Sequence, residues 1–169
     1  MPEKSGIETF EVMCFRQSRK GFDVLLRKEN TLSSYWHNFF TAHSLEPLTE
    51  ESATQVFSLK THLYEKLRLC GNITTSDMNP CQLYFTFLTD ANHATLAASP
   101  GQIIWVNSDV LLTKLVQRPS KFKPELLEML TTCLKHLHKE PEAIISKPFF
   151  QHPDLAGSSM PQKIDAEHI

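Results

Sequence analysis

The sequence predicts an α+β fold in which helices cover a mixed sheet. Segments rich in β-favouring apolar residues come in two pairs, and a helical segment separates the pairs. Two more segments with helical spacing follow the second pair. This order is typical of one sheet packed between helices. With 169 residues, of which 41% are hydrophobic, the chain is long enough for one such domain with its own core.

The first pair of strands is expected to form a hairpin. Residues 7–16 and 22–27 are both rich in β-favouring apolar side chains, and the polar residues 17–21 between them end in glycine. A mostly polar loop at 29–34 then leads into an aromatic group formed by Tyr35, Trp36, Phe39 and Phe40. That group suits either the core under the sheet or stacking on a nucleobase.

A helix is expected over residues 52–69. Thr49 and Ser52 offer hydroxyl caps, and the acidic residues between them suit the positive end of a helix dipole. Gly71 and Asn72 are a signal for the end of a helix. We expect the helix to pack on the core through an apolar stripe made of Val56, Leu59, Leu63 and Leu67, widened by Phe57 and Tyr64.

The second half of the domain is expected to hold two strands and two helices. Residues 82–89 and 102–106 have strand composition, and a loop of small residues at 90–100 separates them. A short helix is expected over 108–115. The clearest helix follows Pro124, because one face carries Leu126, Leu127, Leu130, Cys133, Leu134 and Leu137.

The chain is expected to consist of one domain and a tail. Residues 1–140 hold all the predicted elements, so they are expected to form the domain. Residues 141–169 contain four prolines that interrupt regular structure, namely Pro141, Pro148, Pro153 and Pro161. We expect this tail to be irregular or flexible, and it is a candidate docking arm.

Composition excludes several classes of function. The five glycines stand alone, so the glycine-rich loops of P-loop and Rossmann nucleotide sites are absent. A net charge of -2 excludes a globally basic nucleic-acid binder. No apolar run is long enough for a membrane span. The four cysteines show no paired metal-type spacing, so we expect reduced, buried thiols in an intracellular protein, most simply a cytoplasmic one.

The order of elements and several anchor segments resemble the Nudix hydrolase superfamily. The opening hairpin "FEVMCFRQSRKGFDVLLRKE", the stretch "SLEPLTEES" and the later "GQIIWVNSDVLLTKL" are each similar to segments of that family. Trp36 stands where the family often carries a tryptophan before its glycine loop. The resemblance covers residues 7–138 and implies a Nudix-like α/β/α sandwich, with a mixed sheet between helices.

The catalytic motif of that family is degenerate here. The family gathers carboxylates on one helix face, where they bind Mg²⁺ and activate water against a diphosphate. If Glu51 matches the first glutamate of the motif, the motif's Arg-Glu pair falls on Leu59 and Lys60, and its Glu-Glu pair falls on Leu63 and Tyr64. A one-residue insertion in the helix recovers only Glu65. The resemblance therefore implies a scaffold that has lost most of its metal ligands.

Weak candidates for catalytic and binding roles remain. Glu51 and Glu65 are the catalytic candidates, and the candidate metal ligands are Glu46, Glu50, Glu51 and Glu65. Arg27, Trp36, His43 and Lys60 are the candidates for binding a nucleotide or partner. No cofactor is expected unless the glutamates hold Mg²⁺.

Three hypotheses for the function follow. The preferred one is a catalytically impaired Nudix-like module that binds a nucleotide, RNA or protein partner. The second is an active Nudix-type hydrolase of nucleoside diphosphate derivatives, with a non-standard Mg²⁺ site built from the four glutamates. The third is a structural subunit of a larger assembly, with residues 141–169 as its docking arm.

Overall fold

The computed structural model describes residues 8–29, 35–45, 47–75, 80–99 and 101–139. Residues 141–169, expected to be a tail, lie outside the described residues. The strands and α-helices are β1 Glu8–Ser18, β2 Gly21–Lys28, β3 His37–Asn38, β4 Phe40–Ser44, α1 Glu50–Thr61, β5 Arg68–Thr74, β6 Pro80–Phe87, α2 His93–Ala97, β7 Gln102–Asn107, α3 Ser108–Gln117 and α4 Leu126–Lys139.

The described strands form a seven-stranded mixed sheet with β1 at its centre. β1 and β2 form the predicted hairpin, in which Ser18 pairs with Gly21. The first half of β1 pairs antiparallel with β4, and its other edge runs parallel to β6. β5 continues the sheet beyond β6, while β3 and β7 pair with β2. The sheet confirms the predicted α+β fold class.

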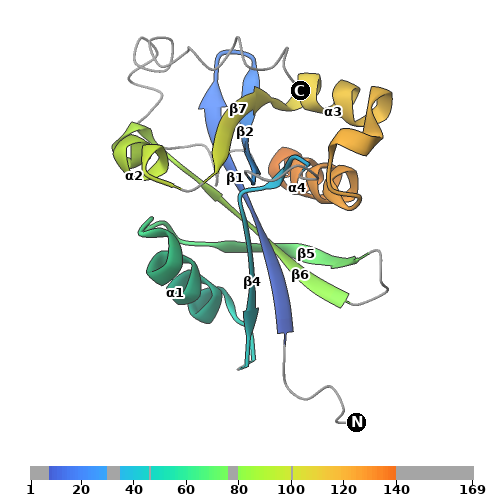
Figure 1. The fold of residues 1–169 in the computed structure, drawn as a ribbon. Helices are drawn as coiled ribbons and strands as arrows, with labels where there is room; N and C mark the ends of the chain where they lie inside the picture. The colour runs from blue at the N-terminus through green and yellow to red at the C-terminus, as the bar shows by residue number, and fades with distance from the viewer. Residues whose placement is uncertain (1–7, 30–34, 46, 76–79, 100, 140–169) are drawn as a thin grey trace.

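Helices cover both faces of the sheet (Figure 1), with α1 and α2 on one side and α3 and α4 on the other. Alternate residues of β1 therefore enter two cores. Phe10, Val12 and Cys14 pack in the α1 cluster, whose other members include Leu25, Phe39, Phe40, Ala53, Phe57, Leu63, Leu67 and Trp105. Met13 and Phe15 pack in the α4 cluster, with Trp36, Leu83, Phe85, Leu130 and Cys133 among others.

A buried polar network ties β1 to the segment that precedes α4. Glu11 is only 2% exposed, and one of its carboxylate oxygens accepts a hydrogen bond of 2.6 Å from Lys123 Nζ. The other oxygen accepts from Asn38 Nδ2 at 2.9 Å and from Thr41 Oγ1 at 2.6 Å. Because every bond to Glu11 comes from a donor and one donor is a cation, the buried charge is compensated.

The predicted helix over 52–69 was wrong at its C-terminal end. α1 begins as expected, because Thr49 and Ser52 form a reciprocal capping box. It ends eight residues early, at Thr61, where His62 takes a left-handed conformation with φ of 63°. The Thr61 hydroxyl group donates to Phe57 O and accepts from Leu63 N, which also helps to end the helix.

The apolar stripe predicted for this helix is confirmed for Phe57, which is buried, and for Val56, which packs against the α1 cluster, but it is wrong for Leu59 and Tyr64. Leu59 is 77% exposed, and so is Tyr64. Leu63 and Leu67 are buried, but they belong to the segment after the helix. The residues of α1 that are buried are Ala53 and Phe57.

Two further expectations need correction. Gly71 does not cap a helix but lies in β5, at a bulge between Leu69 and Gly71. The expected loop at 90–100 begins with a 3-10 turn, Asp90–Asn92, and continues into α2. Thr89 starts this turn, because its side chain caps Ala91 N while Asn92 returns a bond to Thr89 N. Among the described residues, no helix is both long and apolar enough to cross a membrane.

Candidate functional site

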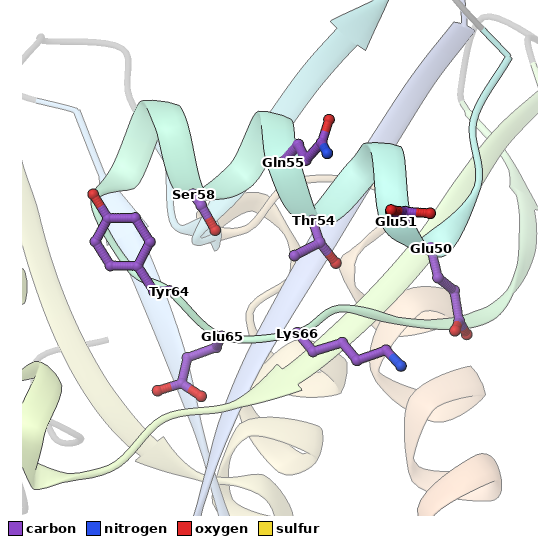
Figure 2. Close-up of a pocket in the computed structure, with 8 residues that line it drawn as sticks. All are labelled: Glu50, Glu51, Thr54, Gln55, Ser58, Tyr64, Glu65 and Lys66. Carbon is purple, nitrogen blue, oxygen red and sulfur yellow. The ribbon is translucent and has the colours of Figure 1, made fainter.

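An open groove runs between α1 and the segment 64–66, which returns beside the helix (Figure 2). Its volume is about 660 Å³. The side chains that line it are polar or charged apart from one aromatic ring, and they are Glu50, Glu51, Thr54, Gln55, Ser58, Tyr64, Glu65 and Lys66. The groove therefore brings together three of the four glutamates expected as candidate metal ligands. The fourth, Glu46, lies outside the described residues.

The groove depends on the early end of α1. After His62 reverses the chain, the returning segment is fixed to the helix by side chains of α1. Thr54 Oγ1 accepts from Leu67 N at 2.9 Å, and Glu50 Oε2 accepts from Leu69 N at 2.8 Å. On the other side, Thr86 Oγ1 of β6 donates to Lys66 O at 2.9 Å. These bonds hold the wall of the groove in place.

The three glutamates do not converge on one point. Glu50 and Glu51 lie in the first turn of α1, whereas Glu65 lies across the groove near the other end of the helix (Figure 2). One oxygen of Glu50 is already bonded to the backbone of β5. Among the residues that the structure describes, no group of three or more His, Cys, Asp and Glu side chains is arranged to hold a metal ion.

Glu65 has an environment of its own. Burial raises the pKa of its carboxyl group, and a hydrogen bond with Asn92 partly opposes this shift. Lys66, the next residue, places an ammonium group in the same groove, where it repels a divalent cation.

The side of α1 that faces the sheet is apolar. Ala53 and Phe57 are fully buried, and the Phe57 ring meets Phe40 edge to face at 5.2 Å. With Glu51 as anchor, the later glutamate positions of the motif that the sequence resembles fall on Lys60, Leu63 and Tyr64. Leu63 and Tyr64 lie beyond the end of the helix. The side of α1 that faces the sheet therefore carries no carboxylate.

The four candidates for binding do not line the groove. Arg27 is partly buried and contacts Phe39. Its Nη2 donates to Phe39 O at 3.0 Å, and its guanidinium carbon lies 4.8 Å from the centre of the Phe39 ring. Its Nε is buried without a hydrogen-bond partner. Trp36 is only 7% exposed and packs in the α4 cluster. His43 is exposed on β4, with Nδ1 2.9 Å from Thr9 Oγ1, and Lys60 is exposed in the last turn of α1.

Sequence reasoning missed most of the groove. Thr54, Gln55, Ser58 and Lys66 were not singled out, because a helix continuing to residue 69 leaves no room for a returning segment. The signal that would have found them is Thr61 followed by a histidine, since Thr hydroxyl groups near a helix end compete for backbone groups. That signal is weak compared with an apolar stripe.

Compared by sequence, the chain matches no family model and no curated protein. Compared by structure, it is similar to a mutT/nudix family protein from Listeria innocua, with a TM-score of 0.60 and 14% identity over 79% of this chain and 94% of that one. It is also similar to Shewanella oneidensis NrtR, with a TM-score of 0.55 and 14% identity over 79% of this chain and 64% of that chain. The NUDIX domain of that NrtR, solved in complex with ADP ribose, gives a TM-score of 0.52 and 11% identity over 81% of this chain and 93% of the domain. The chain therefore has a Nudix-like fold.

Proposed function

We propose that this chain is a Nudix-fold binding module that does not carry out Mg²⁺-dependent hydrolysis of nucleoside diphosphate derivatives. The observation that carries the proposal is the distribution of charge on α1. Its sheet-facing side presents Ala53 and Phe57, and its acidic residues lie only in the first turn. Metal-assisted attack on a diphosphate needs several oxygen ligands that converge on the same ion.

Two of the three carboxylates of the groove have other partners. Glu50 accepts the Leu69 N–H group, and Glu65 interacts with Asn92. A metal bound by both oxygens of either carboxylate would compete with a bond that holds the returning segment or the β6–α2 connection. The Lys66 ammonium group also repels a divalent metal ion more strongly than a singly charged side chain. These features favour binding without metal chemistry.

The groove favours a protein ligand with basic side chains. It carries three carboxylates and one ammonium group, together with the hydroxyl groups of Thr54, Ser58 and Tyr64 and the amide of Gln55. An anionic phosphate chain would meet a net excess of like charge there. A Lys- or Arg-containing segment would instead find carboxylates along the helix and acceptors between them. The partner class that we propose is therefore a basic protein segment.

The hydrolase hypothesis is tested by turnover. The full chain is incubated with ADP-ribose, a dinucleoside polyphosphate or NADH in the presence of Mg²⁺ or Mn²⁺, and product is measured by chromatography. We expect no turnover above the buffer control. Metal-dependent product formation that is lost in both Glu51→Gln and Glu65→Gln would favour the alternative, a hydrolase that uses the candidate glutamates around Mg²⁺.

The binding proposal is tested with defined probes. A fluorescent Lys/Arg-rich peptide and an acidic peptide of equal length are titrated with the full chain, and anisotropy is measured at low and high salt. We expect saturable binding of the basic peptide that weakens with salt. Glu51→Lys should reduce this binding at least fivefold. Glu128→Lys makes the same charge change at an exposed position of α4 and should not reduce it. Equal effects of the two variants would indicate non-specific charge attraction and contradict the proposal.

A second candidate is binding of a nucleoside diphosphate without hydrolysis. It is favoured by the complex of the NrtR NUDIX domain with ADP ribose, a structural neighbour of this chain. Isothermal titration with ADP-ribose tests it directly. Saturable heat with ADP-ribose, together with no anisotropy change for the basic peptide, would replace the first proposal with the second.

A further inference from the structure

Two cysteine thiols from distant parts of the chain lie next to each other on the α4 side of the sheet. Cys70 belongs to β5 and is partly exposed, while Cys133 belongs to α4 and is fully buried. Both pack in the α4 cluster. Cys70 packs against the buried cluster that contains Cys133, and the Cys133 thiol lowers the pKa of the Cys70 thiol. None of the functions discussed above uses this pair.

The backbone around Cys70 brings β5 close to α4. The pairing of β5 with β6 shifts register between Leu69 and Gly71, so Cys70 sits in the bulge. Gly71 then passes close to α4, because a Cβ atom added there would lie 3.6 Å from Thr132 Cγ2. Thr132 is the neighbour of Cys133. The bulge and the glycine together allow Cys70 to pack close to α4, the helix that carries Cys133.

We propose that Cys70 and Cys133 are a redox modification site that forms a disulfide when the protein meets hydrogen peroxide. In the first step the Cys70 thiolate attacks a peroxide oxygen, the O–O bond breaks, and Cys70 sulfenic acid and hydroxide result. In the second step Cys133 sulfur attacks Cys70 sulfur, the S–S bond forms, and the S–O bond breaks. The departing hydroxide takes the Cys133 proton. In total, two thiols and one peroxide give one disulfide and two waters.

The two thiols have different roles in these steps. Cys70 is the partly exposed thiol of the pair, so peroxide reaches it first, and interaction with Cys133 lowers its pKa, which favours the reactive thiolate there. Burial raises the pKa of the Cys133 thiol well above its ordinary value, so Cys133 does not meet peroxide first. Its proximity to Cys70 instead suits it to resolve the sulfenic acid.

The other described cysteines make good internal references. Cys14 and Cys81 are both buried, and burial raises the pKa of the Cys81 thiol to about 12. They should not react with peroxide in the folded protein. A metal site is not an alternative for the pair, since no group of three or more potential ligands is found within the described part of the chain.

The disulfide would connect the outermost strand of the path β3-β2-β1-β6-β5 to α4. It closes a long loop of chain, which removes entropy from the unfolded state. We therefore expect the oxidised protein to melt at a temperature roughly 10 °C higher than the reduced protein. Dithiothreitol should reverse this increase.

The test uses the full chain, reduced and then treated with hydrogen peroxide. Intact mass spectrometry should show a loss of about 2 Da, and mapping without reductant should recover a Cys70–Cys133 crosslinked peptide. Cys70→Ser should abolish both signals, whereas Cys81→Ser should leave both unchanged. Because Cys70 is partly exposed, its serine variant is expected to fold, which circular dichroism checks.

Three results would overturn the proposal. The first is an oxidised mass that rises by the oxygens of sulfinic or sulfonic acid at Cys70, without a crosslink. The second is a disulfide only between two copies of the chain. The third is a 2 Da loss that persists in Cys70→Ser, which would place the reaction at other thiols.

Discussion

Lys123 is the residue whose replacement tests the buried network of Glu11 most directly. Its Nζ lies 2.6 Å from Glu11 Oε2, and it is the cation that compensates this carboxylate. The side chain of Glu11 is 3% exposed and that of Lys123 is 16% exposed. Lys123→Met keeps most of the length of the side chain and removes the charge and the donor. Glu11 is then left as an uncompensated charge in the core.

The expected cost follows from this geometry. Removing one partner of a buried ion pair typically lowers the free energy of unfolding by roughly 3–5 kcal/mol. Asn38 and Thr41 still donate to the other oxygen of Glu11, so we expect the lower part of that range, about 3 kcal/mol. In a domain of this size, such a loss lowers the melting temperature by roughly 10 °C.

Urea unfolding followed by tryptophan fluorescence measures this cost. Lys121→Met is the matched control, because Lys121 is exposed two residues away, and its change should stay within about 0.5 kcal/mol. Glu11→Gln combined with Lys123→Met removes both charges. We expect the double variant to recover at least about 1 kcal/mol relative to Lys123→Met alone. If Lys123→Met were as stable as the control, or if the two changes were additive, the role assigned to this pair would be refuted.

Further predictions concern the helix, a tight turn and one carboxyl group. Phe57→Ala should lower the free energy of unfolding by roughly 3–5 kcal/mol, because it empties the centre of the α1 cluster; calorimetry measures it, and a loss under about 1 kcal/mol would contradict the packing. Thr49→Ala should lower the free energy of unfolding by about 1 kcal/mol in the same measurement, because it removes the capping box. An unchanged free energy of unfolding would mean that the cap contributes nothing. Gly101→Ala should lower the free energy of unfolding by roughly 1–3 kcal/mol, because φ is +81° and the new Cβ would lie 2.8 Å from Lys28 O. An unchanged midpoint of urea unfolding would contradict this prediction. Burial raises the pKa of Glu65, so the folded state binds its proton more readily than the unfolded state and loses stability as pH rises above the ordinary pKa of a glutamate. Glu65→Gln should therefore gain stability relative to the parent as pH rises above that value, and a difference that does not change with pH would refute this.

Much of the fold could be predicted because hydrophobic pattern and local signals agreed. The hairpin of β1 and β2 has apolar strands and a polar turn ending in Gly21, which takes a positive φ of 110°. α4 has an apolar stripe, of which Leu126, Leu130, Cys133 and Leu137 are buried. In these elements the residues that favour the local structure are also those that the core needs.

The end of α1 could not be predicted from periodicity. Leu63 and Leu67 have helical spacing relative to earlier apolar residues, and both are buried. They reach the core from an extended segment, because a left-handed histidine at 62 turns the chain back. Spacing alone does not distinguish these two routes to burial. The groove, with Thr54 and Lys66 on facing walls, was hidden by the same ambiguity.

The separation of Glu11 and Lys123 has a consequence for how the chain is made. The two residues are 112 positions apart, so a ribosome exposes the acid long before the base. At usual elongation rates the interval is roughly 6–20 s. For the first part of that time, until β6 (Pro80–Phe87) has been made, the central strand β1 also lacks its parallel partner. A nascent chain that stops before Lys123 would therefore carry β1 with the Glu11 carboxylate lacking its cation. The apolar side chains of the same strand would not yet be covered by α4. Such intermediates are natural clients for chaperones, and the domain should reach its native state only after α4 has emerged.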